Sequence, residues 1–213
     1  MTQHTLQVAD VDLPDWRWIL SALRTHFRTD GFTAGALFVA DVARIADELN
    51  HHPDVALRYG EVIFTLSSHD VGGVTERDVQ LAERISALAA ERGFVAHPER
   101  AQTLELALDT PAYDVVRPFW AAVLGLDDDG GDDVVDRAGL LPVLWFQKTD
   151  SAAADRQRFH LDITVPPEVA TARINAALAA GGTLVSDDEA PSFVVLADAD
   201  GNKACVCTAL ARD

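Results

Sequence analysis

Residues 32–69 read FTAGALFVADVARIADELNHHPDVALRYGEVIFTLSSH, which is a helical pattern, a proline-containing break and then a strand pattern. Over residues 32–50 the apolar side chains return at helical spacing and predict an amphipathic helix. The helix should stop at His51-His52-Pro53, because the residue before a proline disfavours the α conformation. Residues 55–69 then favour strands. The apolar positions of the helix are Phe38, Val42, Ile45 and Leu49.

The flanking sequence completes a small α+β domain. Before the helix, two alternating stretches, residues 16–20 and 23–27, predict a short pair of strands. After the later strands comes a turn, and residues 75–93 predict a second helix that Thr75 caps and Gly93 ends. The order β-β-α-β-β-α is typical of an antiparallel sheet with helices on one face.

The second half of the chain repeats one plan twice. Its first module is expected to run from a strand at residues 104–110 through a helix and an acidic loop to a strand at residues 141–148. Its second module begins with a strand at residues 158–165, continues with a helix and ends in three strands. Such a duplication is a repeat signal. The expected domains are residues 1–95 and 103–213, joined by a linker at residues 96–102.

Composition indicates an acidic, soluble protein. Seventeen Lys and Arg residues stand against 34 Asp and Glu residues, a formal net charge of −17. This negative charge disfavours direct binding to nucleic acid or to an anionic membrane. The chain shows no secretory signal and no stretch of the roughly 18 apolar residues that span a bilayer. Cys205 and Cys207 are expected to be buried thiols, so a cytoplasmic protein is the simplest expectation.

A spaced set of polar residues carries the chemistry of the first half. Three of the seven histidines fall within nineteen positions, and two carboxylates accompany them. Histidine has the side-chain pKa nearest neutral pH, so such a cluster can both give and take protons. The set predicts an acid/base site, and its members are Asp47, His51, His52, Pro53, Tyr59, His69 and Asp78.

The spacing suggests how these side chains meet. Asp47 and His51 are four residues apart, so on a helix the carboxylate would orient the imidazole. His52 would point about 100° away and address another wall of the same pocket. His69, expected at the end of the second strand, and Asp78, early in the next helix, are expected to converge on this pocket.

Simpler readings of single residues remain open. Asp78 could serve only the positive end of the helix dipole, and Tyr59 could be a half-buried aromatic residue of a strand. A metal site on the three histidines is another alternative, although no CxxC or HExxH spacing supports it.

The string Asp47-x3-His51-His52-Pro53-x5-Tyr59-x9-His69-x8-Asp78 resembles the signature of the pterin-4a-carbinolamine dehydratases, and the similarity extends over about residues 14–95. The resemblance implies an antiparallel sheet packed by helices and assembly into homodimers or larger homo-oligomers. It also implies the activity of a hydro-lyase in tetrahydrobiopterin recycling, namely loss of water from a 4a-hydroxytetrahydropterin to give the quinonoid dihydropterin.

For that reaction His51 and His69 are expected to form the acid/base pair, while His52 holds the pterin. Asp47 would orient His51, and Asp78 would support the pocket rather than act on the substrate. Pro53 and Tyr59 complete the expected substrate-binding set. No metal or redox cofactor is expected, because dehydration changes no oxidation state.

The strings PFWAAVLGL, LWFQK, RFHLDITV and LADADGNKACVCT resemble a glyoxalase-like domain of the vicinal-oxygen-chelate superfamily. The resemblance implies paired βαβββ modules around a cleft, often with a metal held by His and Glu. His160 occupies a ligand position, but Cys205 stands where Glu is typical, and Gln147 and Glu105 complete a poor donor set. A metal-free ligand-binding cleft or a structural partner domain is therefore expected.

Two rival functions follow from the resemblances. The dehydratase fold also serves as a dimerisation partner of a transcription factor, so a binding or regulatory module is one alternative. Catalysis in the glyoxalase-like domain is the other, and its incomplete ligand set argues against it. The complete histidine set favours the dehydratase.

Overall fold

The computed structural model describes residues 4–124, 126–150, 159–197 and 203–211. The chain divides into two compact units, residues 1–101 and 102–213. Within the described residues, no helix combines the length and the apolar character that crossing a bilayer requires.

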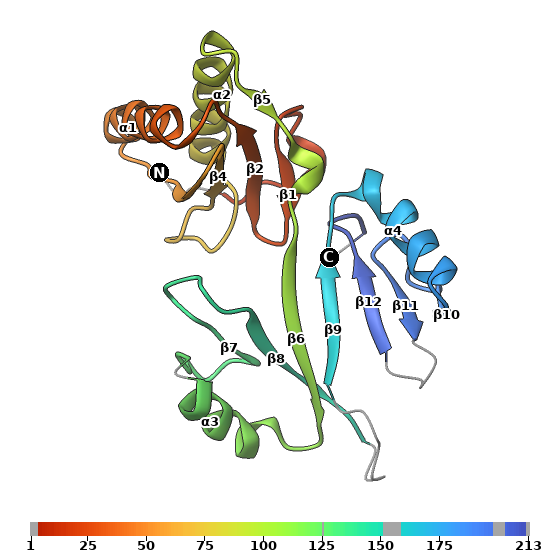
Figure 1. Ribbon diagram of the computed structural model, residues 1–213. Helices are drawn as coiled ribbons and strands as arrows, with labels where there is room; N and C mark the ends of the chain where they lie inside the picture. Colours follow the sequence, from red (N-terminus) through yellow and green to blue (C-terminus); the bar gives the residue numbers. More distant parts are fainter. Residues whose placement is uncertain (1–3, 125, 151–158, 198–202, 212–213) are drawn as a thin grey trace. The chain divides into compact units, whose positions relative to one another are not determined.

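The N-terminal unit is an antiparallel sheet with two long helices, as the sequence predicts (Figure 1). The central strands follow the order β1-β2-β4-β3, and the short β5 pairs with the end of β2, on the edge where β1 pairs with its beginning. The strands are β1 (Arg17–Ile19), β2 (Ala22–Arg28), β3 (Asp54–Arg58), β4 (Glu61–Leu66) and β5 (Val95–Ala96). The helices are α1 (Phe32–Leu49) and α2 (Glu76–Glu91), with short 3-10 turns η1 (Val8–Asp10) and η2 (Pro98–Arg100).

One hydrophobic core joins both helices to the same face of this sheet. Phe38 of α1 is fully buried and makes edge-to-face contacts with Phe27 and Phe64, at centroid distances of 5.7 and 5.5 Å. Leu81 and Ile85 bring the buried stripe of α2 to the same core. This packing holds the end of α1 and the beginning of α2 against one sheet.

The two helix ends that flank the site have well-defined caps. Asn50 ends α1 in the left-handed conformation, with φ 49°, and the His51 amide then donates to the Ala46 carbonyl. Thr75 caps α2 through its side chain, and Asp78 completes a capping box, which confirms the predicted beginning of this helix. Because Asn50 reverses the chain, His51 does not continue the surface of α1.

The strand before His69 is shorter than expected. β3 and β4 form a hairpin through Tyr59 and Gly60, and β4 ends at Leu66. An isolated bridge between Ser68 and Gly73 then closes a turn. His69 therefore lies in this turn and not at the end of the strand.

The C-terminal unit is a seven-stranded mixed sheet of order β10-β11-β12-β9-β6-β8-β7, flanked by two helices (Figure 1). The first module contains β6 (Thr103–Thr110), α3 (Tyr113–Leu124), β7 (Asp133–Val134) and β8 (Val143–Lys148). The second contains β9 (Phe159–Thr164), α4 (Pro167–Ala179), β10 (Thr183–Ser186), β11 (Phe193–Ala197) and β12 (Lys203–Cys207).

The strand pairing of this unit confirms the duplicated plan. The first strands of the two modules, β6 and β9, pair antiparallel at the centre of the sheet. Each of them also pairs in parallel with the last strand of its own module, β8 or β12. The two modules are thus arranged symmetrically about the β6–β9 pair.

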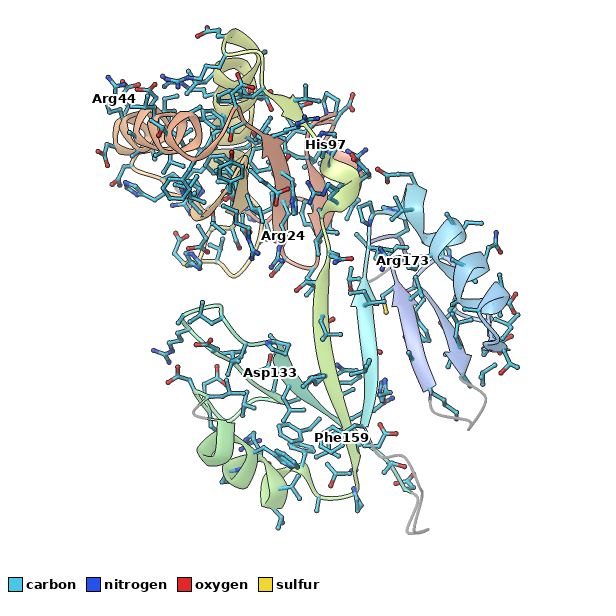
Figure 2. All side chains as sticks on the ribbon, in the orientation of Figure 1. Arg24, Arg44, His97, Asp133, Phe159 and Arg173 are labelled. Carbon is cyan, nitrogen blue, oxygen red and sulfur yellow. The ribbon has the colours of Figure 1, made fainter. Side chains whose placement is uncertain are left out.

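The helices α3 and α4 cover the same face of this sheet. Leu108 and Phe146 pack in the core beside α3, and Leu196 and Val206 pack in the core beside α4. Phe159, labelled in Figure 2, meets Trp120 of α3 edge to face at 5.3 Å. Because side chains alternate along a strand, the opposite face carries a different set of residues. That set includes Glu105, Trp145, Gln147, His160, Asp162 and Cys205.

The two units divide between Ala101 and Gln102, inside the segment expected as a linker. In the N-terminal unit, β5 pairs with the end of β2, and the His97 amide donates to the His26 carbonyl just before η2. The residues that precede the division therefore carry regular backbone hydrogen bonds.

Candidate functional site

The candidate site of the N-terminal unit is built on a buried pair, His51 and Asp78. His51 is 7% exposed and Asp78 is 0% exposed. His51 Nε2 lies 2.7 Å from Asp78 Oδ1. A carboxylate only accepts hydrogen bonds, so Nε2 is assigned as the donor and Nδ1 remains as the acceptor of the neutral ring. This pairing gives His51 a defined tautomer.

The second oxygen of Asp78 is held by three donors. Ser68 Oγ donates to Oδ2 at 2.7 Å, and the Thr75 amide donates at 2.8 Å. The Thr75 hydroxyl lies 3.2 Å from the same oxygen. These hydrogen bonds replace the water that burial removes from the carboxylate. Asp78 is therefore fixed as well as buried, and His51 is oriented through it.

The expected pairing of Asp47 with His51 is wrong. Asp47 Oδ1 instead lies 2.9 Å from His52 Nε2, in an exposed pair. The reason lies in the left-handed Asn50, because it ends the helical geometry on which a contact four residues apart depends. The chain reversal turns His51 inward to Asp78 and leaves His52 outside beside Asp47.

The exposed His69 belongs to a turn that is tied to α2. Its neighbour Asp70 forms an ion pair with Arg77 of the helix. The hydrogen bond from Arg77 is the main cause that lowers the pKa of Asp70. The turn that carries His69 is thus fixed to the beginning of α2, the helix that also carries Asp78.

Tyr59 and Pro53, two of the expected substrate-binding residues, lie outside the buried His51–Asp78 pair. Tyr59 is 88% exposed in the turn between β3 and β4, so it is not a half-buried aromatic residue of a strand. Pro53 is partly exposed between His52 and the beginning of β3. The structure thus brings His51 together with Asp78, and His52 together with Asp47, while Tyr59 stays outside these pairs.

Three further residues of the site were not predicted from the sequence. Ser68 contacts Asp78, and the Asp70–Arg77 pair fixes the turn after it. No motif signals these contacts, since each depends on the chain returning across the β4–α2 connection. The Thr75-x2-Asp78 spacing is different, because it fits a capping box and could have indicated the hydrogen bond between these two residues.

The C-terminal unit has a second titratable cluster on the face opposite its helices. His160 Nδ1 lies 3.1 Å from Asp162 Oδ1, and His160 Nε2 lies 3.1 Å from Gln147 Oε1. Asp109 Oδ1 is 3.5 Å from the same Nε2. The hydrogen bond with Asp162 is the main cause that raises the pKa of His160, and the charge of Asp109 adds to it. Both ring nitrogens thus face oxygen acceptors.

Three residues of this face are of types that can bind a metal ion. His160, Asp162 and Cys205 have ligand atoms within 4.8 Å of one another. A metal-binding imidazole must offer an unprotonated nitrogen, and Cys binds as the thiolate. In this arrangement Asp162 hydrogen-bonds His160, so binding an ion here would require that hydrogen bond to break.

Comparison with known proteins supports the family resemblance of both domains. Residues 1–88 match the sequence model "Pterin 4 alpha carbinolamine dehydratase", and residues 105–207 match "Glyoxalase-like domain". A protein of Mycolicibacterium smegmatis named "Putative pterin-4-alpha-carbinolamine dehydratase" is 40% identical over 91 residues, which cover 97% of that protein and 43% of this chain. A protein of the same name from Nocardia farcinica is 37% identical over 89 residues, covering 94% of it and 42% of this chain.

Among solved structures, a Brucella melitensis protein titled "transcriptional coactivator/pterin dehydratase" matches with a TM-score of 0.35 and 33% identity, covering 36% of this chain and 84% of that one. The sequence matches to the named relatives fall on the N-terminal unit and span nearly their whole length. The chain belongs to the pterin-4a-carbinolamine dehydratase family through its N-terminal domain and carries a glyoxalase-like domain after it.

Proposed function

We propose that the N-terminal domain dehydrates a 4a-hydroxytetrahydropterin to the quinonoid dihydropterin. The C4a–O bond breaks and the hydroxyl group leaves as water after it receives a proton. N5 loses a proton, and the electron pair of the N5–H bond forms the N5=C4a double bond. One proton is given and one is taken, so no metal or redox cofactor is needed for the balance.

The observation that supports this reaction most is the buried His51–Asp78 pair in a chain with the full family signature. With Nε2 donating to Asp78, Nδ1 of His51 is free to accept the proton of N5. Asp78 then stabilises the imidazolium that forms, as a carboxylate does beside a catalytic histidine. His51 is the general base in this proposal.

His69 is the general acid that protonates the leaving hydroxyl group. It is exposed in a turn beside the site, so solvent can return its proton after each turnover. His52 and its partner Asp47 hold the polar edge of the pterin, and Pro53 and Tyr59 complete the substrate-binding set. Each proton transfer is worth about 10² to 10⁴ in rate.

The test is the dehydration rate of purified His51→Ala and His69→Ala. Each substitution should lower the rate by about 10²-fold or more while leaving the domain folded. His97→Ala is the matched control, because His97, labelled in Figure 2, bonds only to Glu99 through its side chain among the described residues. Wild-type rates in both site variants would refute the assignment.

For the glyoxalase-like domain we propose a metal-free ligand-binding role centred on His160. The support is that both ring nitrogens of His160 contact oxygen atoms, one of Asp162 and one of Gln147.

The family resemblance further supports a homodimer or larger homo-oligomer, which sedimentation equilibrium of the full chain would measure.

A further inference from the structure

Ser68 occupies a distinctive place between the two histidines of the proposed acid/base pair. It is 1% exposed and directly precedes His69 in the chain. Its side chain and its backbone make separate sets of hydrogen bonds. The side chain is connected to His51 through Asp78, and the backbone holds the turn that contains His69.

The side chain of Ser68 leads to His51. Its hydroxyl donates to Asp78 Oδ2 at 2.7 Å and lies 2.8 Å from the Thr75 hydroxyl. Asp78 receives His51 on its other oxygen. Because a carboxylate is planar, fixing Oδ2 also fixes the direction in which Oδ1 meets the imidazole. The Ser68 hydroxyl, together with Thr75, therefore holds the carboxylate that His51 contacts.

The backbone of Ser68 leads to His69. The Ser68 amide donates to the Gly73 carbonyl at 2.8 Å, and the Ser68 carbonyl accepts from the amides of Val71 and Gly72 at 3.1 and 2.9 Å. Gly72 has φ 68°, a conformation that favours glycine. These bonds close the turn at residues 68–73 and fix the backbone of His69 within it.

We propose that Ser68 is a positioning residue that aligns both histidines of the proposed dehydration site, His51 through Asp78 and His69 through the turn. This inference rests on the proposed function. The Ser68 hydroxyl is not needed for the cap of α2, because Thr75 and Asp78 complete the capping box without it. Its burial beside the carboxylate thus serves the geometry of the site in addition to the fold.

The test compares Ser68→Ala with Ser67→Ala in the full chain. Ser67 is the matched control, because it is the adjacent serine and its hydroxyl donates to the Ser21 carbonyl instead. Ser68→Ala should lower kcat by about 10- to 100-fold with a smaller change in KM, since misplaced groups slow the chemical step more than binding. Ser67→Ala should leave both constants unchanged.

A readout independent of activity is the ¹⁵N NMR signal of the His51 ring. In the wild type and in Ser67→Ala, the neutral ring should carry its proton on Nε2. Ser68→Ala should shift the signals toward a mixture of tautomers, and Ser68→Thr, which keeps the hydroxyl group, should restore the wild-type pattern. Thr75 is unsuitable for this test because it also caps α2.

The outcomes separate the two proposals. Unchanged kcat and unchanged His51 signals in folded Ser68→Ala would overturn the positioning role. The positioning role would also be overturned if the loss of activity in Ser68→Ala were no larger than the loss of folded protein and the folded protein kept the wild-type His51 signals. A tautomer change in Ser68→Ala together with an inactive wild type would support the alignment of His51 by Ser68 and refute the dehydratase.

Discussion

At the scale of single residues, the chemistry of the N-terminal site depends on which partner each histidine has. Two adjacent histidines end in different environments, because His51 is buried against Asp78 and His52 is exposed beside Asp47. A buried partner fixes one tautomer, whereas an exposed pair is weakened by water and salt. The proposal therefore gives His51 the role of the base and His52 that of a substrate contact.

Asp78→Asn tests the tautomer directly. The amide nitrogen would meet three donors at the Oδ2 position, so it should face His51 instead and donate to Nε2. The proton of the neutral ring then moves to Nδ1, which removes the proposed base. We expect the dehydration rate to fall by about 10²- to 10⁴-fold, and ¹⁵N NMR to show the other tautomer.

Asp47→Asn is the control for this prediction, because its pair with His52 is exposed and leaves the His51 ring untouched. It should affect KM more than kcat. An unchanged rate in Asp78→Asn, with the His51 proton still on Nε2, would contradict the account.

His160 should make the stability of the C-terminal domain depend on pH. Its pKa in the folded state is raised, chiefly by the hydrogen bond with Asp162. The stabilisation is therefore fully present below the unfolded pKa, about 6.5, and is lost as pH rises through the higher folded pKa. Urea unfolding across this range should show the loss in wild type and a flatter profile in His160→Gln.

The same titration followed by NMR gives the folded pKa of His160 independently. Asp162→Asn should lower that pKa toward the ordinary histidine value, because it removes the principal cause of the shift. A wild-type pKa at or below the ordinary value would show that His160 is not held protonated by its neighbours.

At the scale of secondary-structure elements, the positions of the site residues depend on where α1 ends and where α2 begins. Apolar spacing predicted both helices, and the Thr75 cap followed from the sequence. The partner of His51 could not be predicted in the same way, since one left-handed residue at Asn50 changes which side chains meet. The contact of Ser68 with Asp78 depends on the return of the chain from β4 to α2, which local patterns do not specify.

Substitutions at Asn50 test this point. Asn50→Ala should destabilise the N-terminal domain by about 1 kcal/mol, because alanine is disfavoured at positive φ. Asn50→Gly should be nearly neutral in stability, since glycine adopts that conformation readily. Urea unfolding measures both, and the dehydration rate should fall only in the alanine variant. Equal stabilities for the two variants would contradict the role given to this cap.

At the scale of the whole molecule, the chain combines two domains whose candidate sites use separate residues. The N-terminal site comes from residues 47–78, whereas the C-terminal cluster lies on β6, β8, β9 and β12. The duplicated plan of the second domain was visible in the sequence as repeated strand and helix patterns. The hydrogen bonds of His160 were not visible in the sequence. One joins two residues of β9, and the other reaches from β9 across β6 to Gln147 of β8, a strand order that local patterns do not specify.

One measurement on the full chain tests this separation. His160→Ala should leave the dehydration rate unchanged within about twofold, because no residue of the proposed N-terminal site is altered.

A second measurement tests the metal-free role proposed for the C-terminal domain. Calorimetric titration with Zn²⁺ or Mn²⁺ should show no stoichiometric site in this domain. A tight site lost in both His160→Ala and Cys205→Ala would contradict the metal-free proposal.

The most direct test of the proposed dehydration is a stopped-flow ultraviolet assay with 4a-hydroxytetrahydropterin, in which the wild-type chain is compared with His51→Ala. We expect the wild type to accelerate the reaction and His51→Ala to lose about 10²-fold or more of this acceleration. A folded wild type that leaves the spontaneous rate unchanged, or a fully active His51→Ala, would contradict the proposal.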